Sequence, residues 1–120
     1  MKRAAIAMAA IALTVVLAAC QPSVPTVTYF GVSRTGAVEH DLTLTFERRG
    51  ERLIGTYTVD VVRGTFDGTV TAVAVTAVLT PSPTCSYHFA GTFSGTALTG
   101  EFEVADCPGG ESGTWALEQQ

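Results

Sequence analysis

The sequence predicts an all-β fold: an antiparallel up-and-down meander of about eight short strands that forms a small closed or flattened barrel. Three observations favour this fold. After residue 25, threonine, valine and aromatic residues dominate the chain, and apolar positions alternate with polar ones. Glycines interrupt this pattern at short intervals, as expected for turns between strands. No helical spacing of apolar residues is visible in this part of the chain.

The alternation of apolar and polar residues locates the strands along the chain. The predicted strands are 26–33, 40–48, 51–60, 64–67, 70–80, 85–94, 97–104 and 113–118. Residues two positions apart lie on the same face of a strand, so each alternating segment defines one apolar face. These faces comprise Leu42, Leu44 and Phe46; Leu53, Gly55, Tyr57 and Val59; Tyr87, Phe89, Gly91 and Phe93; Leu98, Gly100 and Phe102; and Trp115 with Leu117.

The segment from Val70 to Thr80, "VTAVAVTAVLT", has no strongly polar face. It is predicted to be one central strand that is apolar on both sides.

A repeat supports the meander. The segments "GERLIGTY" (50–57) and "GTALTGEF" (95–102) share the pattern G-x-x-L-x-G-x-aromatic. The first glycine of each suits a hairpin turn, where a positive φ is needed. Eight hairpin-connected strands close most easily as a barrel, whose interior is filled by side chains or holds one small ligand. Frequent inward glycines and short strands favour a filled interior.

Two cysteines test this topology. If the hairpin between the sixth and seventh strands turns at 95–96, Cys85 faces Asp106 and lies one residue from Cys107. Bridged cysteines need α-carbons within about 7 Å, which this pairing provides. We therefore expect a disulfide between Cys85 and Cys107, in an oxidising compartment.

The first nineteen residues have the layout of a secretory signal peptide. Two of the first three residues are basic, and residues 4–19 are uncharged and mostly apolar. This run is short for a membrane-spanning helix, which needs about 20 apolar residues. We expect residues 1–19 to be removed.

The end of this segment, Leu17-Ala18-Ala19-Cys20, resembles the lipobox of bacterial lipoproteins. The resemblance implies a diacylglycerol on the sulfur of Cys20 and cleavage just before it. It covers only the first twenty residues. The alternative is ordinary cleavage after Ala18, which leaves Cys20 a free thiol. Lipid on Cys20 also accounts for the odd cysteine in a chain of three.

The resemblance divides the chain into residues 1–19 as signal peptide, 20–25 as lipidated cysteine and tether, and 26–120 as the β-domain. It implies a protein held in the cell envelope by a lipid anchor outside the cytoplasm. Gln21 stands at the position where an aspartate retains enteric lipoproteins in the inner membrane. Because Gln21 is not an aspartate, the outer membrane is expected in a cell that has one.

After cleavage, five basic and eleven acidic residues remain. This acidic balance argues against a nucleic-acid partner, which requires a basic face.

Three arginines, Arg48, Arg49 and Arg52, cluster on one predicted hairpin. Because the first strand leaves the tether and the second returns, this hairpin is expected at the membrane-proximal end. Each arginine there would gain about 1 kcal/mol against anionic headgroups. The alternative is a solvated turn whose charges prevent association of the protein with other copies of itself.

We expect no catalytic residues, metal ligands or cofactor. His40 and Asp41 are adjacent and point to opposite faces of a strand, and His88 alternates toward solvent. Glu101 and Glu103 are expected on a solvated outer face. Trp115 either lines a ligand pocket or closes the barrel core.

The strand order and the glycine–aromatic rhythm resemble small calycin-type barrels, a group that includes avidins and lipocalins, and small periplasmic inhibitor lipoproteins. The lipocalin G-x-W motif lies near the N-terminus of that family, whereas here Gly113-Thr114-Trp115 lies near the end of the chain. No biotin-binding constellation can be placed on this sequence. Fold likeness alone says little about function.

Two functions follow as expectations. The first is a non-enzymatic envelope protein that binds a protein or envelope polymer or has a structural role. The second is a carrier of a small apolar ligand in the barrel mouth. A cavity of about 300 Å³ or more would favour the carrier, and a contiguous exposed apolar patch would favour the partner-binding protein.

Overall fold

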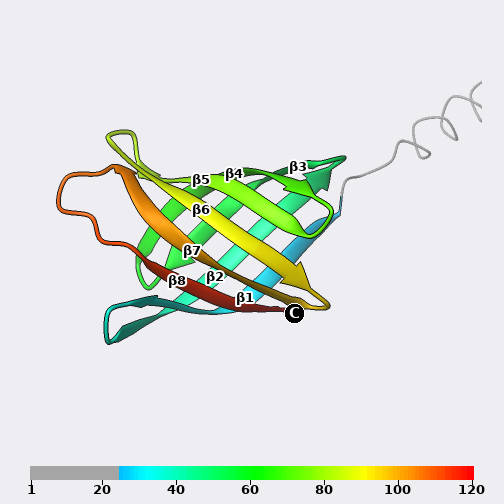
Figure 1. Ribbon diagram of the computed structural model, residues 1–120, viewed down its shortest axis with the longest axis horizontal. Coiled ribbons are helices and arrows are strands. Elements are labelled where there is room, and N and C mark those ends of the chain that lie inside the picture. Colours follow the sequence, from blue (N-terminus) through cyan, green and yellow to red (C-terminus); the bar gives the residue numbers. More distant parts are fainter. Residues whose placement is uncertain (1–24) are drawn as a thin grey trace, which may run out of the picture.

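The structure, a computed structural model, describes residues 25–120 and forms a closed barrel of eight antiparallel strands (Figure 1). The strands are β1 (Thr26–Thr35), β2 (Val38–Arg49), β3 (Arg52–Val59), β4 (Val62–Thr71), β5 (Ala74–Ser82), β6 (Cys85–Ser94), β7 (Ala97–Asp106) and β8 (Gly113–Gln119). Each strand pairs with the next, and β1 pairs with β8 to complete the ring. The predicted all-β meander is confirmed, and the barrel is closed. The expected signal peptide, Cys20 and most of the tether lie outside the described residues.

Alternation along the strands divides the inside of the barrel from its outside. On β2, for example, Leu42, Leu44 and Phe46 are buried while the residues between them are less so. The core consists of inward-facing side chains from all eight strands. Its buried apolar members are Tyr29, Leu42, Leu44, Phe46, Leu53, Tyr57, Phe66, Val70, Val75, Ala77, Leu79, Phe89, Leu98, Phe102, Trp115 and Leu117.

Threonines cover much of the outer face, where they form cross-strand hydrogen bonds such as Thr69–Thr76 at 3.1 Å and Thr28–Thr45 at 3.3 Å. Their β-branched side chains favour the extended backbone and their hydroxyls tolerate water. The outer wall therefore needs no further layer of structure to cover it.

The prediction of one strand from Val70 to Thr80 was wrong. The chain turns at Ala72 and Val73, so Val70 and Thr71 belong to the end of β4 and only the part from Ala74 onward belongs to β5. The fourth strand therefore ends at Thr71 instead of residue 67, and it begins at Val62 instead of residue 64. Uniformly apolar composition concealed this turn, which contains no glycine, proline or asparagine.

The barrel has two different ends. The first strand begins and the chain finishes at one of them, together with the β2–β3, β4–β5 and β6–β7 hairpins (Figure 1). We call this the terminal end. The opposite end carries the β1–β2, β3–β4 and β5–β6 hairpins and the loop 107–112 between β7 and β8. We call it the mouth, because the barrel is hollow there.

Candidate functional site

A cavity of about 450 Å³ opens at the mouth of the barrel. Its lining is mainly aromatic and aliphatic, with polar groups near the rim. The lining residues are Ser33, Thr35, His40, Tyr57, Val59, Asp60, Val61, Val62, Leu79, Pro81, Tyr87, Phe102, Gly109, Gly110, Glu111 and Trp115. The interior is thus filled only in part: side chains pack the barrel toward the terminal end and leave the mouth open. The expectation of a fully filled interior was wrong.

Aromatic rings form the floor of this cavity. The ring centroids of Tyr57 and Trp115 lie 5.5 Å apart, and those of Tyr87 and Phe102 lie 5.8 Å apart in an edge-to-face arrangement. Trp115 also packs against Phe89 below it, at 4.8 Å. Such contacts hold rings in fixed positions, so the floor is preformed. Trp115 combines the two predicted roles, because it is buried in the core and lines the cavity.

Tyr57 keeps its position because Gly64, its partner on β4, has no side chain. A Cβ atom on Gly64 would lie 2.6 Å from the Tyr57 hydroxyl oxygen. Burial raises the pKa of Tyr57 to about 12, and the nearby Tyr87 adds to the effect. The hydroxyl is therefore neutral at physiological pH and can both donate and accept a hydrogen bond.

Polar groups gather on one side of the rim. His40 Nδ1 donates a hydrogen bond to Asp60 Oδ2 at 2.5 Å, and the Asp41 amide donates to Asp60 Oδ1 at 3.3 Å. The Asp60 amide in turn donates to the Asp41 carbonyl at 3.0 Å, which fixes the β3–β4 turn beside β2. Ser33 is paired in register with His40 and is buried.

A serine, a histidine and an aspartate at one cavity invite comparison with a hydrolase triad. That chemistry requires the base to accept a hydrogen bond from the nucleophile. Within residues 25–120, no hydrogen bond joins Ser33 to His40. The arrangement therefore orients His40 toward Asp60 without activating Ser33.

The other residues considered for chemistry lie on the outer wall. His88, Glu101 and Glu103 are exposed, as predicted, and border a shallow depression on β6 and β7. In the described part of the chain, no three His, Cys, Asp or Glu side chains are grouped to hold a metal ion.

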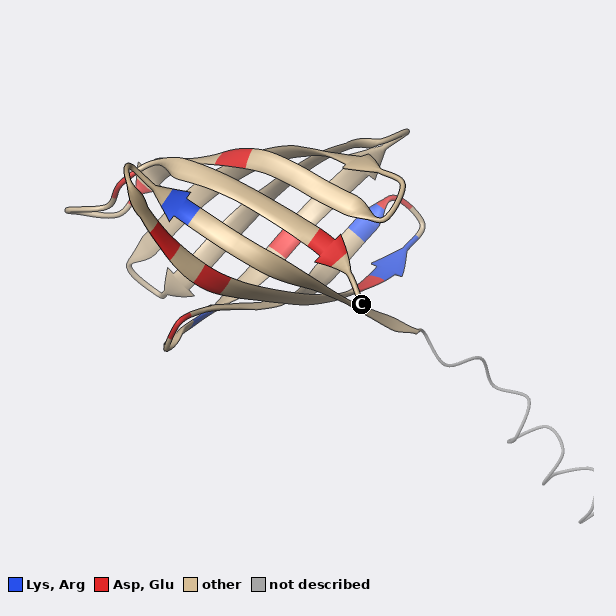
Figure 2. Cartoon of the chain, turned by 90° about the horizontal axis from the view of Figure 1, so that it is seen from below, with Lys and Arg blue, Asp and Glu red and all other residues tan. Residues whose placement is uncertain are grey.

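The three arginines lie on the β2–β3 hairpin, at the terminal end, as the topology predicted (Figure 2). Arg49 pairs with Glu47 at 2.9 Å, and Arg52 pairs with Asp67 at 3.1 Å. Arg48 donates from Nε to the Gly50 carbonyl at 2.9 Å. Because carboxylates neutralise two of the three charges, this geometry favours the solvated turn over a membrane contact.

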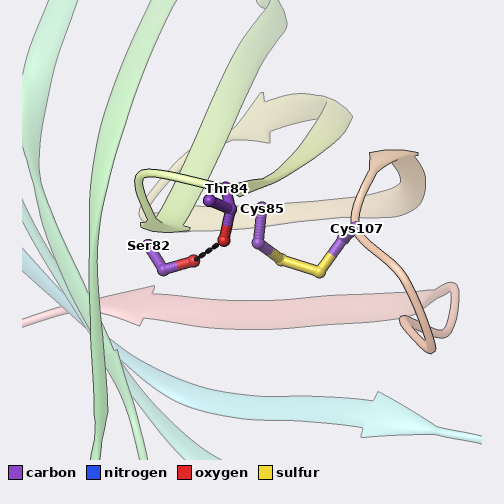
Figure 3. Close-up of a disulfide and its surroundings, with 4 residues drawn as sticks. All are labelled: Ser82, Thr84, Cys85 and Cys107. Atoms are coloured by element: carbon purple, nitrogen blue, oxygen red, sulfur yellow. Dashed lines mark hydrogen bonds between the residues drawn. A yellow bond between two sulfur atoms is a disulfide. The ribbon is translucent and has the colours of Figure 1, made fainter.

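Cys85 and Cys107 form a disulfide at the mouth, with α-carbons 4.2 Å apart (Figure 3). The predicted facing residue was wrong by one position. The register passes from Tyr87↔Val104 to Ser86↔Asp106 and skips Ala105, so a β-bulge brings Cys107 opposite Cys85. The disulfide thereby anchors the loop 107–112, which forms one wall of the cavity.

Two charged residues of the cavity, Asp60 and Glu111, were missed at the sequence level. Both lie in connections, where alternation does not apply. The inward face of β2 could have been extended from Leu42 to His40, which would have placed His40 in the barrel mouth. Its partnership with Asp60, twenty residues away, depends on how two hairpins align.

The outer wall offers no contiguous apolar patch among the described residues. Phe30, Ile54, Val78 and Val104 are exposed, but they lie on β1, β3, β5 and β7, with another strand between each pair. At the mouth, Val38, Val61 and Val62 are exposed on two neighbouring hairpins. The isolated exposed apolar residues of the outer wall are of a kind common on soluble domains and carry no functional argument.

Comparisons of the chain with models of known protein families, with curated proteins and with solved structures find no match. Residues 25–120 contain no helix that is long and apolar enough to cross a bilayer.

Proposed function

We propose that this protein is a non-enzymatic carrier that holds a small, largely apolar ligand in the mouth of its barrel. The observation that supports this most directly is the cavity itself. Its volume of about 450 Å³ lies within the range of about 300–1,000 Å³ that is common for small-molecule sites. Aromatic and aliphatic side chains line it, and a few polar groups lie at its rim, which is the usual composition of such a site.

The proposal extends the likeness to calycin-type barrels from architecture to use. In a closed eight-stranded meander, the interior has room for one small ligand where side chains do not fill it. Here the packed rings of Phe66, Phe89 and Trp115 close the bottom of the cavity, so a ligand would enter and leave through the mouth.

Binding of a protein partner is the second candidate. It is supported by the apolar rim, where Val61 is 92% exposed and Val62 is 50% exposed. These two side chains lie beside the cavity, so a partner seated there would cover it. The ligand-binding proposal is preferred because it accounts for the cavity as well as for its rim.

We further propose that the carrier is anchored to a membrane by lipid on Cys20. The first strand starts at the terminal end of the barrel, so an anchor on that side leaves the mouth facing away from the membrane. A ligand in solution would then reach the cavity without obstruction. Intact-mass measurement of the membrane-purified protein tests the anchor: an unmodified Cys20, or an uncut leader, would rule it out.

The binding proposal is tested with N-phenyl-1-naphthylamine, a neutral apolar fluorophore, and the full chain carrying Cys20→Ser, purified without detergent. Trp115 is the only tryptophan and lies in the cavity, so energy transfer from it to the probe reports binding at this site. We expect saturable transfer that an excess of a non-fluorescent apolar ligand reverses.

Two matched variants locate the binding. Val59→Phe fills the cavity and should reduce the affinity at least tenfold, whereas Val78→Phe makes the same change on the outer wall and should leave it unaltered. Absence of saturable binding to the parent chain would refute the carrier proposal. Equal binding by both variants would place the probe elsewhere and refute it too.

A further inference from the structure

We infer that the ligand carries a positively charged nitrogen beside its apolar part, and that this charge lies at the mouth between Asp60 and Glu111. The inference rests on the proposed carrier function and specifies the chemical class of its ligand. Three features of the cavity point to an organic cation: its aromatic faces, its rim charges and its hydroxyl oxygens.

The aromatic faces are the first feature. Tyr57, Tyr87, Phe102 and Trp115 all line the cavity, with the Phe102 and Trp115 centroids 6.3 Å apart. The face of an aromatic ring is electron-rich and attracts cations, most strongly where water is excluded. Groups of aromatic rings around one small cavity therefore suit alkylated ammonium groups as well as neutral apolar ones.

The rim charges are the second feature, and they separate cations from neutral ligands. Asp60 on the β3–β4 turn and Glu111 on the loop 107–112 both line the cavity. In the ring of eight strands, β3 and β4 lie opposite β7 and β8. The two carboxylates therefore stand on opposite sides of the mouth. No lysine or arginine lines this cavity, and the basic side chain that does line it, His40, is hydrogen-bonded to Asp60.

The surrounding charges have the same sign. The connections and strand ends at the mouth carry five acidic residues and two arginines: Glu39, Asp41, Asp60, Asp106, Glu111, Arg34 and Arg63. Arg34 is paired with Glu39. His40 is the remaining titratable group of the rim, and its Nδ1–H is committed to Asp60. A neutral imidazole leaves the negative charge of Asp60 in place.

Hydroxyl oxygens are the third feature. Ser33 and Tyr57 both line the cavity, and their side chains are 4% and 5% exposed. Together with the two carboxylates they offer oxygen atoms to a ligand. Arginine and lysine side chains, which form the strongest hydrogen bonds to anionic groups, are absent from the lining.

The test compares three ligands with the same eight-carbon chain: octyltrimethylammonium, 1-octanol and octyl sulfate. Binding to the full chain carrying Cys20→Ser is followed by Trp115 emission at about pH 8, where imidazole groups are usually neutral. We expect octyltrimethylammonium to bind at least tenfold more tightly than octyl sulfate and more tightly than 1-octanol.

Matched variants assign the preference to the rim. Combining Asp60→Asn with Glu111→Gln should reduce the preference for the cation over 1-octanol at least fivefold, while the affinity for 1-octanol changes little. Glu51→Gln removes one negative charge at the terminal end of the barrel and should leave the preference unchanged.

The outcomes separate the two proposals. If none of the three ligands binds, the carrier function itself fails. If 1-octanol or octyl sulfate binds as tightly as the cation, the carrier function stands and the inferred positive charge is wrong. A preference that survives the double substitution would also overturn the assignment to Asp60 and Glu111.

Discussion

Tyr57 links the stability of the barrel to the shape of its cavity. Its ring packs on Trp115, its hydroxyl end lies against Gly64, and the residue lines the cavity. The same burial that holds the ring in place raises the pKa of the phenol to about 12, from an ordinary value of 10.0. Ionisation of this group is therefore coupled to unfolding.

Alkaline pH should destabilise the protein through this residue. The unfolded chain ionises Tyr57 near pH 10, while the folded chain keeps it protonated to about pH 12. The contribution of the protonated Tyr57 to the free energy of unfolding is therefore complete below pH 10 and is lost as the pH rises through 12. We expect urea unfolding to shift to lower concentrations across this range, and Tyr57→Phe to reduce the shift.

Two other tyrosines provide the controls. Burial also raises the pKa of Tyr29, as does the charge of Glu118, so some alkaline sensitivity should remain in Tyr57→Phe. Tyr87→Phe removes a half-buried phenol at the same cavity, and this variant should retain most of the loss of stability at alkaline pH. An unchanged alkaline shift in Tyr57→Phe would contradict the role assigned to Tyr57.

Among the elements, the β4–β5 hairpin has an unusual turn. Its first residue, Ala72, has a φ of 56°, a conformation that favours glycine. Gly36, Gly50 and Gly95 occupy the corresponding position in three other hairpins, with φ between 59° and 63°. Ala72 is therefore held in a conformation that costs about 1–2 kcal/mol for a residue with a Cβ atom.

Replacing Ala72 by glycine should stabilise the barrel by about 0.5–1 kcal/mol, because relief of this strain exceeds the entropy that glycine adds to the unfolded chain. Urea unfolding of the two proteins measures the difference. Ala74→Gly makes the same chemical change at the first residue of β5, where no positive φ is needed, and should destabilise by about 0.5–1 kcal/mol. A loss of stability in Ala72→Gly would show that Ala72 is not strained.

The same hairpin shows what limits prediction from the sequence. Alternation identified the inward faces of β2, β3, β6, β7 and β8, because one face of each of these strands is buried. Glycine marked the turns at Gly50 and Gly95, but nothing in "TAVA" marked the turn at Ala72. The bulge at Ala105 also escaped prediction, since it depends on how β6 and β7 twist against each other.

The cavity could not be predicted for a related reason. Whether an eight-stranded barrel is filled depends on the summed volume of its inward side chains at each level. At the mouth, small or polar groups such as Ser33, Thr35 and Val59 stand beside the cavity rings, while the rings of Tyr29, Phe46 and Phe93 pack against one another elsewhere in the barrel. Periodicity gives the direction of a side chain, but it does not show where a ring leaves space.

At the scale of the whole molecule, the disulfide connects barrel stability to the mouth. It joins the start of β6 to the residue after β7, and the loop that follows supplies Gly109, Gly110 and Glu111 to the cavity. Within this loop the Gly110 amide donates to the Cys107 carbonyl at 3.0 Å, and Gly110 lies close against the Tyr87 hydroxyl. The position of this wall therefore depends on Cys107.

Removing the disulfide should affect stability and binding together. Replacing Cys85 and Cys107 by serine frees a loop closed by a sequence separation of 22, and the lost constraint on the unfolded chain is worth about 3 kcal/mol. Because the loop 107–112 is released as well, the affinity for N-phenyl-1-naphthylamine should fall under conditions in which the double variant is still folded. Reductant should reproduce both effects in the parent chain and have no effect on the variant. If the free energy of unfolding falls while the affinity for the probe is unchanged, the loop is positioned by its own packing against Tyr87. The disulfide then stabilises the barrel without shaping the cavity.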